Sequence, residues 1–596
     1  MCGIVGARHS WLLQNGLDPA AAMHAAVERL RWRGPDGTGV VRIGDWWLGC
    51  ARLAITQEGS RQPVVRRGGR FAAVLNGAIT NARELWARLL PGAERRPAPP
   101  NDAWLPLLAV ARGDREALLH LRGHHAYAVV DVTTGDLVYG QDRFGEKPLL
   151  GLLSGSGTKW TVVAFGSTPP ALQALGMPPL AAQRRFPDLL HFGFADWQPH
   201  RCHARLWVGA PPHRGTPLVA GASSGFRSPW LGRSQPAAPL PVARPAPAPL
   251  REQFFAGIAR CIDTTQPVGL LLSGGIDSSC LAAGLHHHRR RAPAFQFLAT
   301  GNDPAERRVA QEVAAHCGLP FHPVDGGPEV LEALPHLTEL AGLPLGDPSI
   351  LAVHATARAA AAQGVRVLLS GEGADELFLG YRRYRALTTL PRLPIPTALQ
   401  PQWSMRYLAR WWRAVAARDP ARTLLEVTPP GFRRAILGDT AELAAQPIPQ
   451  GDRVLAARTA DLDGYLRLDL LPKVDIATMA AGVEGRCPFL EGDFAEFGAT
   501  RKALGKRPLR QAFADDLPRA VFTLPKRGFA LPLDRWCRGD CVLLDVLTDR
   551  RSQQRPHLRP GSLAGVVDRH RRGAADLGHG LYLLAAMELF LRHQER

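Results

Sequence analysis

One short stretch, residues 270–279 with the sequence Leu-Leu-Leu-Ser-Gly-Gly-Ile-Asp-Ser-Ser, constrains the fold of this chain more than any other. The apolar run 268–272 predicts a buried strand, and the Ala-rich segment 280–288 predicts a helix. Between them, Gly274 and Gly275 let backbone N–H groups approach a ligand, to which the helix presents its positive N-terminal end. The stretch therefore predicts a strand–turn–helix cradle for an anion such as pyrophosphate.

Hydroxyl and carboxylate side chains give this cradle its chemistry. Leu272 ends the predicted strand, and Ser273, Ser278 and Ser279 supply hydroxyl donors for phosphate oxygens. The Asp277 carboxylate would repel phosphates unless a divalent cation lies between them, and Mg²⁺ suits that position. The stretch lacks the Gly-Lys-[Ser/Thr] ending of the Walker loop. A Gly/Ser turn that only caps a helix is the alternative.

The residues after the cradle alternate between predicted strands and helices. Apolar runs at 295–298, 321–324 and 365–369 predict strands, with helices at 305–317 and 352–363 between them. This alternation predicts a doubly wound parallel sheet that binds ligands at the carboxyl ends of its strands. The last strand leads into a second acidic cluster, for which a solvated acidic turn is the alternative: Ser370, Gly371, Glu372 and Asp375.

Size and composition set broad limits. A chain of 596 residues is too long for one core, so two or more domains are expected. No apolar run is long enough to predict a membrane span, and the first residues lack the pattern of a secretory signal. The nine cysteines are scattered without a Cys-x-x-Cys pair, which predicts a reducing cytoplasm and no structural zinc.

The net charge of +19 raises the question of a nucleic-acid partner. The arginines are spread along the chain, and the one dense run, 286–291, follows the helix of the cradle, whose C-terminal end it would stabilise. A tRNA-modifying protein with the same phosphate loop would be expected to carry redox or metal cysteines and an RNA module, and neither is found. We therefore predict small-molecule substrates, without a membrane or nucleic-acid partner.

The N-terminal residues predict a nucleophile. Removal of the initiator Met would leave Cys2 with a free amine, which can accept the proton of its own thiol. A series of short motifs follows at characteristic spacing: 2–6, 30–37, 51–55, 62–63, 75–77, Asp102, 123–128 and 142–149. In this order they resemble the N-terminal-nucleophile domain of class II glutamine amidotransferases, and most closely that of glutamine-hydrolysing asparagine synthetases. Alternating short apolar runs and Gly/Pro turns agree with a sheet-rich layered domain.

The resemblance implies roles for residues in both domains. Cys2 would be the nucleophile, Asn76 and Gly77 the oxyanion hole, and Arg52 and Asp102 the groups that hold free glutamine. The loop at 272–279, with Ser370 and Gly371, would bind ATP, whose cleavage yields AMP and pyrophosphate. Glu372 would accept a proton, Asp277 and Asp375 would bind Mg²⁺, and Lys473 would neutralise ATP phosphates.

The resemblance extends through the C-terminal half. The stretch 471–490 resembles the family's Lys-Val-Asp…Glu-x-Arg-x-Pro-Phe-Leu signature, and 505–510 and 526–536 also match its helical region. Three positions differ from the family pattern. Ala78 stands where the family usually has Glu, and Thr168 also differs from the family pattern. Gly342 stands where the family usually has Asp, near the region that binds the acceptor.

These observations predict two domains and two activities. Residues 1–205 form an α+β glutaminase domain of layered sheets and helices. Residues 206–250 form a Pro-rich linker or insertion, and 251–596 an α/β parallel-sheet synthetase domain with a helical C-terminal region. The predicted enzyme is a carbon–nitrogen ligase that passes ammonia from glutamine through an internal channel to an acyl-adenylate, by default that of L-aspartate. The alternative is a related synthetase that closes a ring with an internal amine, as in β-lactam or lasso-peptide formation. The resemblance also admits a homodimer.

Overall fold

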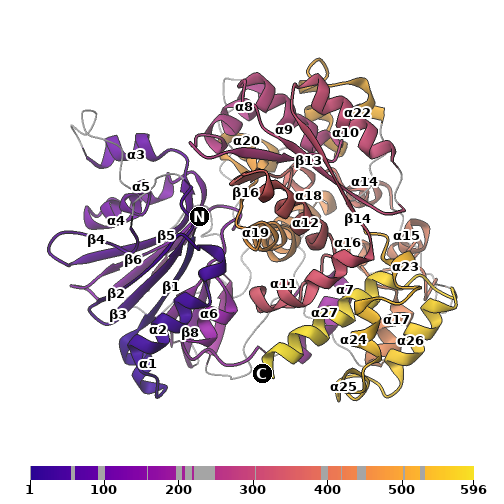
Figure 1. The fold of residues 1–596 in the computed structure, drawn as a ribbon, viewed down its shortest axis with the longest axis horizontal. Coiled ribbons are helices and arrows are strands. Elements are labelled where there is room, and N and C mark those ends of the chain that lie inside the picture. The colour runs from indigo at the N-terminus through magenta and orange to yellow at the C-terminus, as the bar shows by residue number, and fades with distance from the viewer. Residues whose placement is uncertain are drawn as a thin grey trace.

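The computed structural model describes the chain except for residues 1, 56–60, 91–100, 157–158, 181, 196–203, 209–217, 221–248, 302–303, 391–399, 418, 439–451, 501, 503, 524–530 and 596. The N-terminal domain contains two antiparallel sheets, and the C-terminal domain contains a parallel sheet surrounded by helices (Figure 1). The predicted fold class is confirmed for both domains.

The N-terminal domain is a sandwich of two sheets. The first has the order β10-β8-β9-β1-β3-β2, with bounds β1 (Cys2–Arg8), β2 (Gly37–Ile43), β3 (Trp46–Arg52), β8 (Leu150–Ser156), β9 (Lys159–Gly166) and β10 (Ala204–Val208). The second has the order β11-β7-β6-β5-β4, with bounds β4 (Val64–Val65), β5 (Phe71–Ile79), β6 (Gly123–Asp131), β7 (Asp136–Gln141) and β11 (Leu218–Ala220).

Alternation along the strands explains this layering. In β1, Cys2 and Ile4 belong to the core between the sheets, whereas Val5 and Ala7 pack toward the covering helices. The first sheet is covered by α1 (His9–Gln14), α2 (Pro19–Glu28) and α6 (Pro169–Gln173), and the second by α3 (Ala82–Leu89), α4 (Trp104–Ala111) and α5 (Arg115–Leu119). Cys2 therefore starts an inner strand of a four-layered domain.

The C-terminal domain is organised by a parallel sheet of order β14-β13-β12-β15-β16. Its strands are β12 (Val268–Leu271), β13 (Ala294–Ala299), β14 (Phe321–Gly326), β15 (Val367–Leu369) and β16 (Glu484–Arg486). The helices of this region are α8 (Leu250–Cys261), α9 (Ile276–His287), α10 (Ala305–His316), η3 (Pro328–Ala333), α11 (Leu334–Ala341), α12 (Ser349–Ala362) and α13 (Ala374–Leu377). The predicted strand–turn–helix cradle corresponds to β12, a short turn and α9.

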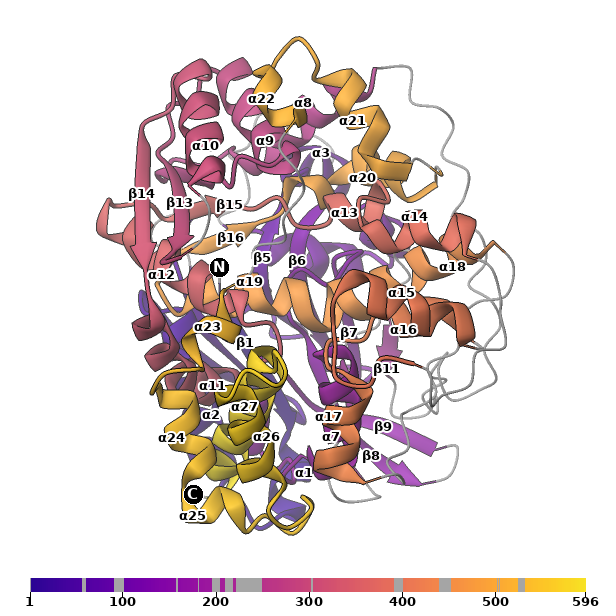
Figure 2. The same cartoon turned by 90° about the vertical axis from the view of Figure 1, so that its right-hand side faces the viewer.

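The C-terminal part is helical, and in Figure 2 its helices lie above, beside and below the parallel sheet. Its elements are α14 (Arg382–Thr389), α15 (Tyr407–Ala416), α16 (Pro420–Leu424), α17 (Pro430–Leu437), α18 (Arg453–Ala460), the π-helical η5 (Asp461–Leu470), α19 (Leu471–Met479), η6 (Pro488–Leu490), α20 (Gly492–Thr500), η7 (Leu504–Lys506), α21 (Arg507–Ala512), α22 (Arg519–Thr523), α23 (Leu533–Trp536), α24 (Val542–Thr548), α25 (Arg550–Gln553), α26 (Ser562–Arg571) and α27 (Gly578–Gln594). Helix α27 is largely buried among apolar side chains.

The segment 206–250, expected as a Pro-rich linker or insertion, is only partly described. Its first residues complete β10, which pairs with β8, and residues 218–220 form β11, which pairs with β7. Residues 209–217 and 221–248 lie outside the described residues. The domain boundaries at 205 and 250 therefore remain a proposal.

Candidate active sites

The first candidate site is built around Cys2 at the start of β1. Cys2 is 5% exposed, and its backbone N–H donates to Asn76 Oδ1 at 3.0 Å. Asn76 lies on β5 in the facing sheet, and its buried Nδ2 has no hydrogen-bond partner among the described residues. A buried donor without a partner is unfavourable, so this amide beside the thiol is poised to bind an added acceptor oxygen.

Two further side chains surround the Cys2 sulfur. Gln62 Nε2 lies 3.8 Å from Cys2 Sγ, and the Gln62 amide is fixed by Leu75, whose N–H and C=O it meets at 2.7 and 3.1 Å. A thiol–thiol hydrogen bond with Cys50 lowers the pKa of Cys2 to about 7, although burial acts in the opposite direction. A lowered pKa favours the thiolate, which is the reactive form of a cysteine side chain.

The other predicted residues of this site lie nearby. Gly77 follows Asn76 with φ of +106°, and a Cβ there would lie 2.0 Å from the carbonyl oxygen of His124, so a side chain is excluded. Arg52 pairs with Cys2 across the strands β3 and β1. Asp102 Oδ2 accepts the N–H of Ile79 at 2.9 Å, and burial raises the pKa of Asp102 to about 6. The structure thus gathers Cys2, Arg52, Asn76, Gly77 and Asp102 at one end of the sandwich.

The second candidate site starts at the turn between β12 and α9. Ser278 Oγ accepts the N–H of Ser273 at 3.1 Å and donates to the carbonyl of Gly275 at 3.2 Å, so the turn is held by its own hydroxyls. Gly274 has φ of +80°, and a Cβ there would lie 3.0 Å from backbone atoms of α10. Ser279 is fully buried, and its hydroxyl has no partner among the described residues.

A large cleft opens beside this turn, with a volume of about 1260 Å³. The predicted residues that line it are Leu272, Ser273, Gly275, Asp277, Ser278, Ser370, Gly371, Glu372, Asp375 and Lys473. Gly274 and Ser279 do not line it; the first shapes the turn and the second packs inside α9. The carboxyl ends of β12 and β15 therefore meet at one cleft, as expected for a parallel sheet.

Two buried lysines organise the carboxylates of this cleft. Lys473 Nζ lies 2.8 Å from Glu372 Oε1 and 3.2 Å from Asp347 Oδ2. Lys506 Nζ lies 2.5 Å from Asp277 Oδ2 and 2.7 Å from Asp375 Oδ1. Of the two lysines, the sequence predicts only Lys473 as a site residue; it does not predict Lys506 or Asp347, although 505–510 resembles a family motif.

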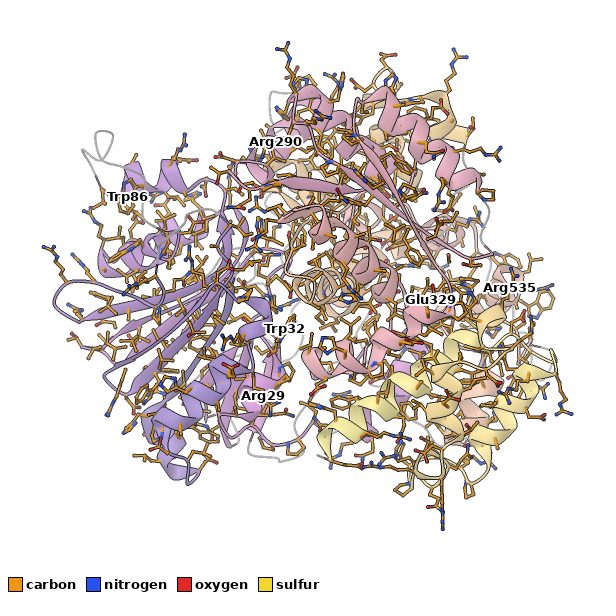
Figure 3. All side chains as sticks on the ribbon, in the orientation of Figure 1. Arg29, Trp32, Trp86, Arg290, Glu329 and Arg535 are labelled. Carbon is orange, nitrogen blue, oxygen red and sulfur yellow. The ribbon has the colours of Figure 1, made fainter. Side chains whose placement is uncertain are left out.

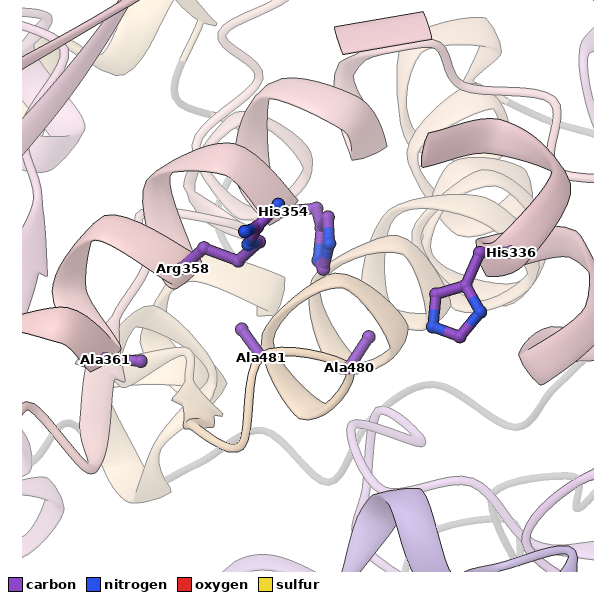
Figure 4. A pocket seen from close by; sticks show the side chains of 6 residues that line it. All are labelled: His336, His354, Arg358, Ala361, Ala480 and Ala481. Atoms are coloured by element: carbon purple, nitrogen blue, oxygen red, sulfur yellow. The ribbon is translucent and has the colours of Figure 1, made fainter. Parts of the chain in front are cut away.

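A smaller pocket of about 420 Å³ lies at the end of α19, between α11 and α12 (Figure 4). It is lined by His336, His354, Arg358, Ala361, Ala480 and Ala481, none of which had been predicted as a site residue. His354 Nδ1 lies 3.1 Å from the carbonyl oxygen of Ala477, which fixes the ring against α19. This pocket is separate from the lining of the large cleft.

Comparison with known proteins identifies the family to which each domain belongs. The family model for asparagine synthase matches residues 249–592, more than half of the chain, and that for the glutamine amidotransferase domain matches residues 1–206. The chain belongs to the asparagine synthase family. It is a carbon–nitrogen ligase of the glutamine-hydrolysing type, a family that uses ATP.

Two curated relatives match almost the whole chain, and a third matches part of it. A putative glutamine-hydrolysing asparagine synthetase of Mycobacterium tuberculosis H37Rv is 28% identical and covers 99% of this chain and 97% of its own. Asparagine synthetase 1 of Bacillus subtilis is 25% identical over 91% of this chain and 88% of its own. Asparagine synthetase 2 of rice is 27% identical over 59% of this chain and 55% of its own.

The asparagine synthase signature divides its residues between the cleft and the domain interface. Lys473 faces the cleft, whereas Asp475, two residues along α19, forms a buried ion pair of 2.7 Å with Arg33 of the amidotransferase domain. Glu484 on β16 lies 2.9 Å from His124 Nε2 and 2.7 Å from Arg486 Nε. The signature thus fixes one domain to the other as well as lining the synthetase site.

Apolar contacts complete this interface. Leu53, Ile55 and Phe144 of the amidotransferase domain join the core cluster beneath the phosphate loop, and Trp32 packs against the same cluster. Figure 3 shows Trp32 on the side of the amidotransferase domain that faces the synthetase domain.

Among the described helices, none is long and apolar enough to cross a membrane.

Proposed function

We propose that this enzyme transfers the amide nitrogen of glutamine to L-aspartate, with cleavage of ATP to AMP and pyrophosphate. The observation that carries the proposal is the pairing of Glu372 with Lys473 inside the cleft of the phosphate loop, at 2.8 Å. A carboxylate and an ammonium fixed together at the carboxyl end of a parallel sheet suit a reaction that moves a proton beside phosphates. The family membership and the preformed Cys2 site support glutamine as the nitrogen donor.

Glutamine hydrolysis would use the groups around Cys2. The Cys2 thiol gives its proton to its own free amine, after removal of Met1, and the thiolate attacks the side-chain amide carbon of glutamine. The amine returns the proton to the leaving nitrogen, so that the C–N bond breaks, ammonia departs and water hydrolyses the thioester to glutamate. During each attack, negative charge develops on the carbonyl oxygen. Asn76 Nδ2, which has no partner among the described residues, and the backbone N–H of Gly77 are the proposed donors to that oxygen. Fixed donors of this kind contribute about 3–4 kcal/mol each in enzymes that use them.

Arg52 and Asp102 are the proposed recognition groups for free glutamine. Arg52 would pair with the α-carboxylate and Asp102 with the α-ammonium. Ala78, where the family pattern has a carboxylate, leaves Asp102 with more of the ammonium recognition. Asp102 is anchored through the N–H of Ile79, one residue after Ala78 on β5.

Glutamine binding is expected to weaken as the pH falls through about 6. Burial raises the pKa of Asp102 to about 6, and only its ionised form attracts the ammonium of glutamine. Binding is therefore strongest above this pKa, and affinity declines below it. The measurement is the KM for glutamine as a function of pH, with the reaction monitored by the release of glutamate in the absence of ATP.

The Asp102→Asn variant supplies the control for this pH dependence. Its KM should be about tenfold higher or more near neutrality, because the amide can still accept a hydrogen bond but lacks the charge that attracts the ammonium. Its profile should also be flatter through pH 6. A wild-type KM that stays constant from about pH 5 to pH 7 would contradict the role of Asp102.

The proposed ATP site combines the hydroxyls of the phosphate loop with a magnesium site. Ser273, Ser278, Ser370 and Gly371 line the cleft where phosphates would bind. Asp277 and Asp375 converge on one cationic group, Lys506, and hard carboxylate oxygens arranged in this way fit Mg²⁺. Bound Mg²⁺ would neutralise phosphate charge during cleavage of ATP.

Glu372 and Lys473 are the proposed proton-transfer pair of the synthetase site. Ammonia that attacks an acyl-adenylate must lose a proton, and Glu372 is the proposed acceptor of that proton. Lys473 is buried, which alone would lower its pKa, but the charges of Asp347 and Glu372 outweigh this effect and raise the pKa well above the usual value. Lys473 therefore stays charged, remains paired with Glu372 and offers an ammonium to the phosphates.

The decisive test measures asparagine, AMP and pyrophosphate with Mg-ATP and L-aspartate, using either glutamine or ammonium as nitrogen source. The wild type should use both sources, whereas Cys2→Ala should use ammonium alone. Cys317→Ala, which removes a buried thiol outside both sites, is the matched control and should keep both reactions. If no AMP is released from ATP in the presence of L-aspartate with either nitrogen source, the acceptor is a different carboxylate and the ring-closing alternative gains support.

A further inference from the structure

Two cysteines lie next to each other in the helical C-terminal part, outside both candidate active sites. Cys537 directly follows α23 and Cys541 directly precedes α24, so a turn of three residues separates them (Figure 1). Their sulfur atoms lie 3.9 Å apart, close enough for a hydrogen bond between the thiols. Neither residue lines the large cleft or belongs to the core around Cys2. The chain therefore holds a preformed pair of thiols that the proposed reactions do not use.

The packing of the flanking helices keeps the two thiols together. Cys537 is buried in the core cluster that also contains Leu543 of α24, and Cys541 packs against this cluster. On the other side of the turn, the Asp534 carboxylate of α23 accepts the N–H of Gly578 at 2.8 Å, which joins α23 to the start of α27. Both ends of the turn are thereby fixed. A disulfide requires only that the distance between the sulfur atoms shortens to about 2.0 Å.

The two thiols differ in their accessibility. Cys537 is 0% exposed, whereas Cys541 is partly exposed, and residues 538–540 between them are all exposed. Among the eight cysteines in the described part of the chain, Cys541 alone is not buried. A small reagent can therefore reach Cys541 at the turn, while Cys537 is protected behind it.

The hydrogen bond between the thiols also distinguishes their reactivity. It is the main cause that lowers the pKa of Cys541 to about 6; the backbone N–H of Leu544 assists, whereas burial and the charge of Asp545 oppose this shift. The same hydrogen bond raises the pKa of Cys537, and burial adds to that shift. Because the thiolate is the nucleophile in thiol–disulfide exchange, the accessible sulfur is also the more reactive one.

We propose that Cys537 and Cys541 form a reversible redox site, at which a low-molecular-weight disulfide such as glutathione disulfide converts the two thiols into an intramolecular disulfide. A disulfide in a reducing compartment is usually transient and redox-sensing, which agrees with two thiols held close but unlinked. The proposal is independent of the acceptor and of both candidate active sites.

The reaction has two exchange steps. The Cys541 thiolate attacks one sulfur of the reagent, whose S–S bond breaks, and the leaving thiolate takes up a proton. The Cys537 thiol then loses its proton and attacks Cys541 Sγ, which lies 3.9 Å away in the reduced chain, and the second glutathione leaves and is protonated. The protein loses two protons and two electrons, and the reagent gains them to become two thiols.

Trypsin supplies a direct test, because it cleaves after Arg538, between the two cysteines. The full-length chain is incubated with excess glutathione disulfide, its remaining thiols are blocked with N-ethylmaleimide, and the tryptic peptides are analysed by mass spectrometry. We expect peptides 536–538 and 539–550 as one disulfide-linked species without bound glutathione, which dithiothreitol separates. Absence of the linked species, or glutathione retained on Cys541 of the wild type, would overturn the proposal.

Three variants test the order of the steps. Cys537→Ser should stop after the first exchange and retain one glutathione on peptide 539–550, whereas Cys541→Ser should retain none on peptide 536–538. Cys317→Ala, which removes a buried thiol elsewhere, should form the linked peptides as the wild type does. Glutamate release from glutamine before oxidation should be the same in all three, which reports that the chain is folded. Glutathione retained by Cys541→Ser instead of Cys537→Ser would contradict the roles given to the two thiols.

Discussion

Replacement of Glu372 by glutamine is expected to reduce amide formation by about 10²–10⁴-fold, the usual contribution of a positioned general base. The side chain keeps its size and its contact with Lys473 but loses the charge and the capacity to accept a proton. The cleft around it should remain intact, because Lys473 keeps its second partner, Asp347, at 3.2 Å. Asparagine formation from L-aspartate and ammonium, with saturating Mg-ATP, is the measurement.

Partial reactions locate the defect of this variant. Glutamate release at Cys2 should continue at the wild-type rate, because the glutamine site does not include Glu372. Exchange of labelled pyrophosphate into ATP should persist if only proton transfer is lost. Glu339→Gln, on the exposed face of α11, serves as the control and should keep full activity. Amide formation within about threefold of the wild type would exclude Glu372 as the base.

Replacement of Asp475 by asparagine is expected to destabilise the enzyme by about 3–5 kcal/mol, because a buried charge loses its partner. Arg33 is fully buried, Asp475 is 3% exposed, and they meet through two contacts of 2.7 and 2.9 Å across the domain interface. Asparagine can retain one hydrogen bond but cannot compensate the arginine charge. Unfolding in urea, monitored by fluorescence, measures the change in the free energy of unfolding.

An exposed ion pair across the same interface supplies the comparison. Arg122 and Asp493 lie 3.3 Å apart with side chains 41% and 55% exposed, so Asp493→Asn should change stability by no more than about 1 kcal/mol. The double variant Arg33→Met with Asp475→Leu should recover part of the loss, since it leaves no unpaired buried charge. Equal effects of Asp475→Asn and Asp493→Asn would contradict this account.

Local sequence patterns predicted much of the fold and the strand–turn–helix cradle, whereas the residues proposed around Cys2 came from the resemblance to a known family. An apolar run followed by Gly274 and Gly275 and an Ala-rich segment specifies β12 and α9 without information from elsewhere in the chain. Strand β16 was not predicted, because its sequence, Glu-Gly-Arg, is polar. It is a buried strand only because Glu484 pairs with His124 and Arg486.

The same reasoning explains which site residues escaped prediction. Asp277 and Asp375 each follow a predicted strand, and that position alone identifies them as candidates. Lys506 is more than two hundred residues from Asp277 in sequence, and its role depends on a contact that only the folded chain creates. The position of Gln62, which precedes β4, likewise depends on its hydrogen bonds with Leu75 on β5. Ser279 had a suitable residue type, but the helix turns it into the core.

Helix α19 limits the modularity of this enzyme. Lys473 and Asp475 lie two residues apart, about 200° around the helix, so one face serves the synthetase cleft and the other the amidotransferase domain. If the first domain were exchanged for that of a relative, the new domain would therefore have to fit the face of α19 that carries Asp475, as well as the point where the two domains join in the chain. Cleft residues away from α19 can change with the acceptor without affecting the first domain. A change on α19 has to preserve the contacts with both domains.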